Sequence, residues 1–393
     1  MLFVIWEQEW GYMFQNNDTF ILKKINYVDV INHSCVINKD IVVENGIISH
    51  IEENISSHDS ENVFDCTNLW AIPSFIDTHV HLSFNPFCCD DFSNERAIIL
   101  NLTDATLAGT CLVRDLGSNG HLSKEIISVQ KQNRLCFPEI ITAGTPLCIN
   151  SGHGSEYGVS VAQEGIDEWL FFHKKHGHTW VKIMNDPERH SQDFLNKVVL
   201  SAHKIGLKVA CHVFTPKGIC SAISAGVDSV EHSLPHEKIY LKNAAKMFFV
   251  PTAFSAFISI QDDFLNQVTA QESQHLIDWY NFLHESFRKS YINSCNISTG
   301  TDGGCAPSRL SDIKNEIKFL ANQGIDNMQC LCAASINGAL LLGKEEEYGS
   351  ISIGKYANII VFKNNPVENI NEIDAPLAIW LRGTKIKKEV TFL

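Results

Sequence analysis

The chain has 393 residues, of which 45% are hydrophobic and 19% are charged, a composition typical of a globular protein with a sizeable core. This length allows one barrel of about 250 residues together with a smaller appended domain. Its 45 acidic residues outnumber its 31 lysines and arginines and give a net charge of −14, which argues against a nucleic-acid-binding surface and against binding to anionic lipid.

The cysteines and the N-terminus indicate the cellular compartment. The 13 cysteines show no CxxC pair and no regular spacing, so we expect reduced thiols rather than a disulfide framework or a zinc–cysteine site. The N-terminal stretch MLFVIWEQEWGYMF has no basic leader and no small-residue cleavage site, and no uninterrupted apolar stretch reaches about 18 residues. We therefore expect a cytoplasmic protein without a signal peptide or a transmembrane helix.

Both ends of the chain are predicted to form short strands. Alternating or β-branched patterns occur over 20–31, 40–53, 61–67, 349–365 and 375–393. Asn45-Gly46 is a strong signal for a two-residue hairpin turn. Because each end has too few strands to close a core alone, we expect 1–70 and 348–393 to combine in one small β-sandwich domain.

The middle of the chain, residues 71–347, alternates predicted strands and helices. Eight strands are expected, at Ala71–Leu82, Thr110–Leu116, Glu139–Leu147, Thr179–Met184, Leu207–Phe214, Ser229–Ser233, Phe248–Ala253 and Ile297–Asp302. Between most of them lie segments with apolar residues three and four apart, such as 191–206, which are typical of helices. This α/β order predicts a (β/α)8 TIM barrel, whose active site lies at the carboxyl ends of the strands.

Residue types that bind metals occur at several of these strand ends. His79 and His81 can face the same side of the first strand and bind one ion, although two histidines hydrogen-bonded to neighbours would give the same pattern. Lys182 in the fourth strand is expected to point inward, either paired with a carboxylate or carboxylated by carbon dioxide and bridging two metals. His212, His232 and Asp302 end the fifth, sixth and eighth strands. The joint pattern predicts a metal site.

These motifs resemble those of the amidohydrolase superfamily. The segment 72–81, IPSFIDTHVH, resembles the signature in which a Pro-Gly pair leads into Ile-Asp-x-His-x-His, with Ser74 in place of the glycine. The sequences GTDGG at 300–304, SINGA at 335–339 and GSISIGKYANIIVF at 349–362 also fit. The resemblance covers nearly the whole chain from about residue 20. It is strongest to the branch of imidazolonepropionase-like and Xaa-Pro dipeptidase-like hydrolases.

The resemblance implies a particular set of ligands. His79, His81 and Asp302 would bind the more buried metal, His212 and His232 would bind the more exposed metal, and a carboxylated Lys182 would bridge the two ions, which we expect to be zinc. Lys182 argues against an imidazolonepropionase proper, which uses one metal. Thr215 stands where deaminase relatives have a glutamate, which argues against deamination. The residues after Lys182, Ile-Met-Asn-Asp-Pro, differ from the Gly- and Ser-rich run of dipeptidase-like members.

Further residues are expected to act in catalysis and substrate binding. Asp302 would take a proton from the metal-bridging hydroxide and pass it to the departing nitrogen. His153, in the glycine-rich loop 150–154, would contact the substrate. Arg114 would either bind a substrate carboxylate or form a structural ion pair with Asp115. Five other histidines are expected to be solvated, namely His121, His173, His176, His190 and His203.

The sequence thus predicts a binuclear hydrolase that attacks a carbon–nitrogen bond in a small-molecule substrate such as a dipeptide or an N-acyl amino acid. Two alternatives remain open, namely a hydrolase of a cyclic amide, carbamate or urea-type compound and a non-catalytic scaffold. A requirement for a substrate carboxylate distinguishes the first two, and bound metal with turnover distinguishes both from a scaffold. No nucleic-acid or membrane partner is expected, and a homo-oligomer is compatible with the sequence.

Overall fold

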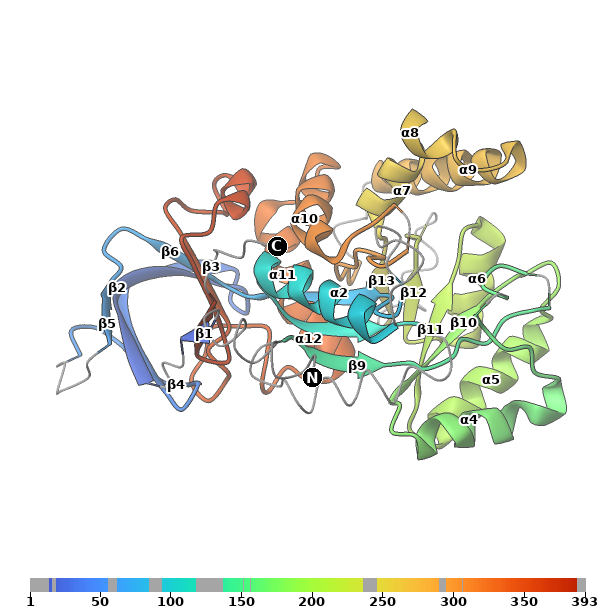
Figure 1. Cartoon of the computed structure of the whole chain (residues 1–393), viewed down its shortest axis with the longest axis horizontal. Helices are drawn as coiled ribbons and strands as arrows, with labels where there is room; N and C mark the ends of the chain where they lie inside the picture. Colours follow the sequence, from blue (N-terminus) through green and yellow to red (C-terminus); the bar gives the residue numbers. More distant parts are fainter. Residues whose placement is uncertain are drawn as a thin grey trace.

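Figure 1 shows the computed structural model of the chain, which describes residues 14–15, 19–55, 62–84, 94–117, 137–150, 152–155, 157–235, 246–289, 295–305 and 307–386. A curved sheet built from both ends of the chain lies at one side of the molecule. Alternating strands and helices from the middle of the chain form the remainder. The strands of this middle part position the candidate site.

Strands from both chain ends form one nine-stranded sheet. They are β1 (Phe14–Gln15), β2 (Thr19–Asp29), β3 (Ser34–Glu44), β4 (Ile47–Glu52), β5 (Val63–Asp65), β6 (Trp70–Pro73), β14 (Ile359–Phe362), β15 (Ala378–Leu381) and β16 (Thr384–Ile386). Their order is β1-β16-β15-β14-β6-β2-β3-β4, with β5 paired to β2. Hydrogen bonds thus join the two ends through β14 and β6. The strands form one continuous sheet, whereas the predicted sandwich has two separate sheets.

The turn between β3 and β4 is the hairpin predicted at Asn45-Gly46. Both residues have positive φ, 53° and 76°, as a two-residue turn that follows the strand twist requires. A Cβ at Gly46 would lie 2.5 Å from the carbonyl oxygen of Arg382, so the turn also packs closely against the loop before β16. The hairpin prediction is confirmed.

The middle of the chain forms two parallel sheets. One contains β7 (Phe75–Val80), β8 (Thr110–Asp115) and β9 (Glu139–Thr142), and the other contains β10 (Trp180–Met184), β11 (Lys208–His212), β12 (Ser229–Glu231) and β13 (Phe248–Val250). These strands are buried almost throughout, as is typical of parallel strands covered on both faces. They account for seven of the eight predicted strands. The first predicted strand is divided at Ser74, because β6 pairs in the nine-stranded sheet.

Backbone hydrogen bonds link the two parallel sheets next to β9 and β10. Leu147, which follows β9, donates its N–H to the carbonyl of Lys182 and accepts from the N–H of Met184, both at 2.8 Å. Leu147 also forms a parallel bridge with Ile183. The residues after β9 therefore continue the pairing up to β10.

The segment 297–303 lies between β13 and β7. Phe249 forms a parallel bridge with Ile297, and Val80 forms one with Gly303. The prediction of a regular eighth strand is corrected, because this segment makes isolated bridges instead. At Gly300 a Cβ would lie 2.5 Å from Val250 Cγ1, so the backbone there runs too close to its neighbours for an ordinary side chain.

Helices connect and cover the parallel strands. They are α2 (Asn94–Ala108), α4 (Ile166–Lys175), α5 (Gln192–Lys204), α6 (Pro216–Ala225), α7 (Ala253–Ser259), α8 (Asp262–Leu265), α9 (Ala270–Phe287), α10 (Ile313–Asn322), α11 (Asn327–Ala333) and α12 (Ile336–Leu342), with 3-10 turns at Gln163–Gly165, Leu310–Asp312 and Ile370–Asp374. The predicted helix over 191–206 is α5. Ser191 caps its N-terminus, and Leu195, Val198 and Ala202 form its buried face.

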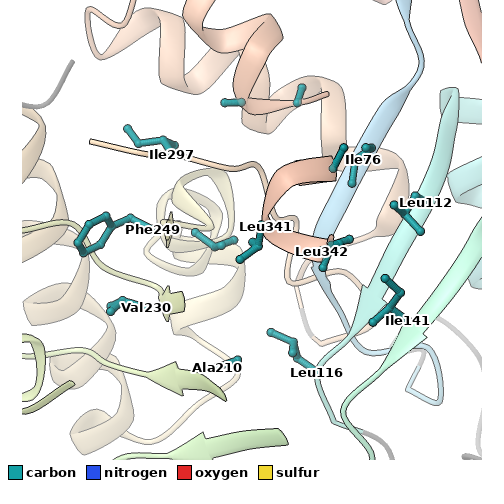
Figure 2. Packing of buried hydrophobic residues seen from close by; sticks show 14 of the residues in the cluster. Ile76, Leu112, Leu116, Ile141, Ala210, Val230, Phe249, Ile297, Leu341 and Leu342 are labelled. Carbon is teal, nitrogen blue, oxygen red and sulfur yellow. The ribbon is translucent and has the colours of Figure 1, made fainter. Parts of the chain in front are cut away.

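Side chains from both parallel sheets meet in one large core. Figure 2 shows Leu341 of α12 and Leu116 lying between side chains of the first sheet and side chains of the second. The approach of α12 to β7 requires Gly338, because a Cβ there would lie 2.7 Å from Ile76 Cγ2. The SINGA motif therefore has a packing role.

Two further expectations concern the cysteines and the membrane. Among the described residues no two cysteines form a disulfide, whereas Cys88, Cys89 and Cys136 lie outside the described residues. Among the helices of the described ranges, none is long and apolar enough to cross a membrane.

Candidate metal centre

The residues predicted as metal ligands lie at neighbouring ends of the parallel strands. His79 and His81 are at the end of β7, Lys182 is in β10, His212 ends β11, His232 follows β12, and Asp302 is in the segment between β13 and β7. The histidines and the lysine are buried, and the Asp302 side chain is 17% exposed. The centre is thus closed at its base and accessible at the aspartate.

Asp302 lies among the histidines. Its Oδ1 is 3.4 Å from Nε2 of His79 and 3.3 Å from Nε2 of His81. Two triads with mutual ligand-atom distances below 4.8 Å share this carboxylate. One contains His79 and His232, and the other contains His81 and Cys305. The resemblance implied His79 and His81 around Asp302, so His232 and Cys305 are additions to that group.

The imidazole rings continue in a row from the Asp302 carboxylate toward the loop 150–154, which carries His153. Ring centroids are 4.6 Å apart for His79 and His232, 4.5 Å for His232 and His212, and 4.6 Å for His212 and His153. Lys182 Nζ lies 3.3 Å from His79 Nε2. The structure therefore brings all six predicted ligands and His153 into one group of neighbours.

Three of the four histidines among the candidate ligands are oriented by their other ring nitrogen. Nδ1 of His79 is 2.8 Å from Glu231 Oε2, Nδ1 of His81 is 3.0 Å from the carbonyl of Gly117, and Nδ1 of His232 is 2.8 Å from Thr252 Oγ1. With Nδ1 of each ring held by an oxygen, Nε2 is directed toward the centre. Metal-binding histidines characteristically have such partners.

His212 differs from these three. Its Nδ1 is buried and has no hydrogen-bond partner among the described residues. A buried polar atom without a partner is rare and requires an explanation. A metal ion at Nδ1 would satisfy this atom.

Burial and neighbouring charges set the protonation of the group. Burial lowers the pKa of His79, His212 and His232 well below the usual value, so these rings are neutral donors. Burial also lowers the pKa of Lys182, to about 8, against the opposing effect of Glu231 and Asp302.

Asp302 and His81 shift each other's pKa in opposite directions. Burial would raise the pKa of Asp302, but the hydrogen bond from His81 and the charges of His81 and Lys182 hold it well below its usual range. Burial would lower the pKa of His81, but Cys305 and Asp302 raise it well above its usual value. The Asp302 side chain is therefore an ionised carboxylate, stabilised by the positive charge around it.

Three residues at this centre have strained backbone. His232, Thr252 and Asp302 have φ values of 67°, 46° and 56°, in the left-handed region that ordinary side chains avoid. Each is a ligand candidate or the partner of one. Strain of this kind persists where surrounding structure holds it and is concentrated at functional sites.

Glu231 is a residue whose role the sequence did not reveal. Its fully buried carboxylate accepts from His79 Nδ1 through Oε2 and from Arg114 Nη2 through Oε1, at 2.8 and 3.0 Å. Arg114 also donates to the carbonyl of Thr78 and the hydroxyl of Ser229. The position of Glu231 immediately before His232 was the one sequence signal for this supporting role.

The two predictions for Arg114 are corrected accordingly. The side chain is completely buried, and all three of its described donor contacts end on protein atoms, so it does not reach a substrate carboxylate. Its ion pair is with Glu231, whereas Asp115 accepts from the N–H of Leu82. Arg114 acts on the centre through Glu231.

Asp77 connects the strand of the two histidines to the segment of Asp302. It accepts from the N–H of His79 at 3.2 Å and from the N–H and hydroxyl of Thr301 at 3.0 and 2.6 Å. Burial raises its pKa to about 7. Asp77 thus holds the strand end with His79 and His81 next to the segment with Asp302.

The remaining histidines have mixed surroundings. His153 is exposed in its loop, with its ring 5.8 Å from that of Phe214, next to His212. His203 is exposed as predicted, and His176 and His190 are partly buried. The expectation for His173 is wrong, because it is buried and its ring nitrogens meet the carbonyls of Trp169 and Thr145. His121 lies outside the described residues.

An α/β fold that gathers buried imidazoles, a lysine and a carboxylate at the ends of parallel strands defines a hydrolytic enzyme of the metal-dependent type. The chain belongs to the amidohydrolase family, whose family model matches residues 70–388. This confirms the resemblance found in the sequence. The protein is accordingly a hydrolase acting on carbon–nitrogen bonds.

Individual relatives are distant in sequence. An uncharacterized protein of Mycobacterium tuberculosis is 23% identical over 338 residues, covering 82% of this chain and 86% of the relative. An ochratoxinase of Aspergillus niger is 23% identical over 371 residues, covering 80% and 75%. The crystal structure of a Xaa-Pro dipeptidase with bound methionine superposes with a TM-score of 0.84 at 22% identity, covering 94% of this chain and 100% of that one. This structural likeness supports the fold.

Proposed function

We propose that the chain is a binuclear metal-dependent amidohydrolase that hydrolyses the amide bond of a dipeptide or an N-acyl amino acid. The observation that supports this most is the group around Asp302, in which three buried histidines are oriented through Nδ1 toward a common centre. Hydrogen bonds that orient several imidazoles toward one point are characteristic of metal-binding histidines, whereas packing alone does not require them.

The proposal includes the architecture around this centre. The hydrogen bonds of Leu147 with β10, and the bridges of 297–303 with β13 and β7, support a closed (β/α)8 barrel in which an irregular segment takes the eighth position. We assign the barrel to about 71–347 and a small β domain to 1–70 and 348–393. Ser74, between the end of β6 at Pro73 and the start of β7 at Phe75, would be the crossover between them.

The donor set fits two divalent ions. His79, His81 and Asp302 would hold one, His212 and His232 would hold the other, and Lys182 would lie between them. The unpartnered Nδ1 of His212 supports binding through that atom. When bound, the ions supply Lewis acidity and lower the pKa of water.

The protein's own residues would then orient the substrate and move the proton. Oδ1 of Asp302 faces both imidazoles of β7, so its other oxygen is available to accept a proton and to return it to the departing nitrogen. His153 adjoins His212 from the loop after β9 and would contact the substrate carbonyl or carboxylate. Lys182 would bridge as a carboxylate, which adds an anion between two cations.

Two features support an amide as the substrate. The structural relative named as a Xaa-Pro dipeptidase covers 94% of this chain, so a dipeptide is the first substrate class to test. Thr215, at the deaminase glutamate position, serves as the N-cap of α6 by accepting from the N–H of Gly218. Its hydroxyl cannot act as the proton shuttle of a deaminase.

A substrate screen tests this proposal. Zinc-loaded protein would be assayed against Xaa-Pro and other dipeptides, N-acyl amino acids, their carboxamide counterparts, and lactams. We expect turnover of compounds with a free carboxylate and loss of turnover when that carboxylate is amidated. Turnover restricted to cyclic amides would contradict the linear-amide assignment, and turnover of none by metal-replete protein would contradict catalysis.

A further inference from the structure

Cys305 is a thiol placed beside the metal centre that the amidohydrolase ligand set does not use. Its Sγ, a side-chain nitrogen of His81 and a carboxylate oxygen of Asp302 lie within 4.8 Å of one another. The side chain is partly buried, whereas Cys211, on the strand of His212, is completely buried. Cys305 therefore combines access with proximity to two ligand atoms.

The backbone fixes Cys305 relative to those two residues. The N–H of Cys305 donates to the carbonyl of Asp302 at 3.2 Å, which closes a tight turn. The same turn accepts the N–H of His81 at the carbonyl of Gly303, at 2.8 Å. A Cβ at Gly304 would lie 1.9 Å from the carbonyl oxygen of His81, so glycine is required for this contact. The thiol is thus held at the end of β7 by the segment that positions Asp302.

We propose that Cys305 is a sulfur ligand of the ion held by His81 and Asp302. This inference rests on the proposed metal centre and extends it from nitrogen and oxygen donors to a mixed set that includes a thiolate. On binding, the thiol loses its proton to solvent as the sulfur–metal bond forms. A thiolate ligand favours Zn²⁺, Co²⁺ and Cd²⁺ over Mg²⁺ and Mn²⁺, because soft donors favour soft ions.

Cobalt substitution gives a readout that is independent of catalysis. Thiolate bound to Co²⁺ absorbs in the near ultraviolet by charge transfer, whereas imidazole and carboxylate ligands alone do not. We expect this band in the full-length cobalt-loaded protein and its loss in Cys305→Ser. The matched control is Cys220→Ser, a partly buried thiol on α6, which should keep the band unchanged. Elemental analysis of each sample counts the bound cobalt.

The outcomes separate this inference from the proposed function. Bound cobalt without the band in the wild-type protein, or a band that persists in Cys305→Ser, overturns the role of Cys305 and leaves the metal centre intact. Absence of bound cobalt overturns the metal centre and the inference together. X-ray absorption of the zinc-loaded wild-type protein needs no variant, and a sulfur neighbour at about 2.3 Å is expected. A first shell of nitrogen and oxygen alone would refute the proposal.

Discussion

Replacing Glu231 with glutamine tests how much the buried contacts of Glu231 contribute to stability and to holding the candidate ligand His79. Glu231 has no exposed surface and accepts from Arg114 Nη2 at 3.0 Å and from His79 Nδ1 at 2.8 Å. Glutamine keeps the shape but removes the charge, so Arg114 becomes a buried cation without its carboxylate. Breaking a buried ion pair from one side lowers the free energy of unfolding by about 3–5 kcal/mol.

The same substitution should loosen His79. Loss of such a histidine partner lowers metal affinity by about 10–100-fold, so metal binding should weaken together with stability. Urea unfolding of metal-free protein measures the first effect, and zinc titration against a competing chelator measures the second. Removing the orphaned charge with Arg114→Met in the same chain should recover part of the lost stability.

An exposed pair provides the matched control. Glu188 lies 2.7 Å from Lys217, and both side chains are largely exposed, so Glu188→Gln should change the unfolding free energy by less than about 1 kcal/mol. If Glu231→Gln behaved like this control in both assays, the account of Glu231 as the support of His79 would be refuted.

Four more predictions follow from the same geometry. Lys182→Ala should lose metal and activity and recover part of both when a short carboxylic acid is added, as measured by metal content and turnover; equal loss with and without the acid would contradict a bridging carboxylate. Asp302→Asn should keep most of its metal while turnover falls roughly 100-fold or more, because an amide cannot accept the proton; near-normal turnover would assign the proton transfer to another group, with His153 next. Removing the last 40 or so residues should expose the N-terminal strands and cause aggregation in light scattering, whereas a monomeric, active truncation would contradict the shared β domain. Glu316 is completely buried, and burial raises its pKa to about 8 against hydrogen bonds from the N–H groups of Phe254 and Ala253. Because the folded pKa exceeds the unfolded value of about 4.3, its contribution to stability is complete below that value and is lost as the pH rises through about 8. Urea unfolding at several pH values should show a steeper decline between about pH 4.3 and pH 8 for the wild type than for Glu316→Gln, and parallel curves over this range would refute this.

The grouping of the candidate ligands could be predicted because it depends on local spacing and chain order. His79 and His81 are two residues apart on a strand, and carboxyl ends of parallel strands meet at one edge whatever the exact strand lengths are. The grouping of His232 and Cys305 around Asp302 depends on side-chain directions after a positive-φ residue, which the residue types do not reveal.

The supporting contacts could not be predicted because they join distant segments. Arg114 and Glu231 are on β8 and β12, which belong to different sheets, and Glu231 of this ion pair also contacts His79. A helical position with polar neighbours made His173 look solvated, yet its ring fits between α4 and the carbonyl of Thr145. Such contacts depend on how elements pack, which periodicity alone does not determine.

Charge balance connects the proposals for Lys182 and Cys305. Two divalent ions would enter a buried centre in which Arg114 already neutralises Glu231, so Asp302 alone among the candidate ligands contributes fixed negative charge. Uncompensated charge in a buried site costs several kcal/mol, on the order of the stability of a whole domain. Carboxylation of Lys182 converts a buried base to an anion, and a thiolate at Cys305 adds another beside His81. Both changes would reduce the same excess of positive charge, so at equal metal content each lowers the demand for the other, and Cys305→Ser should raise rather than reduce the carboxylated fraction of Lys182.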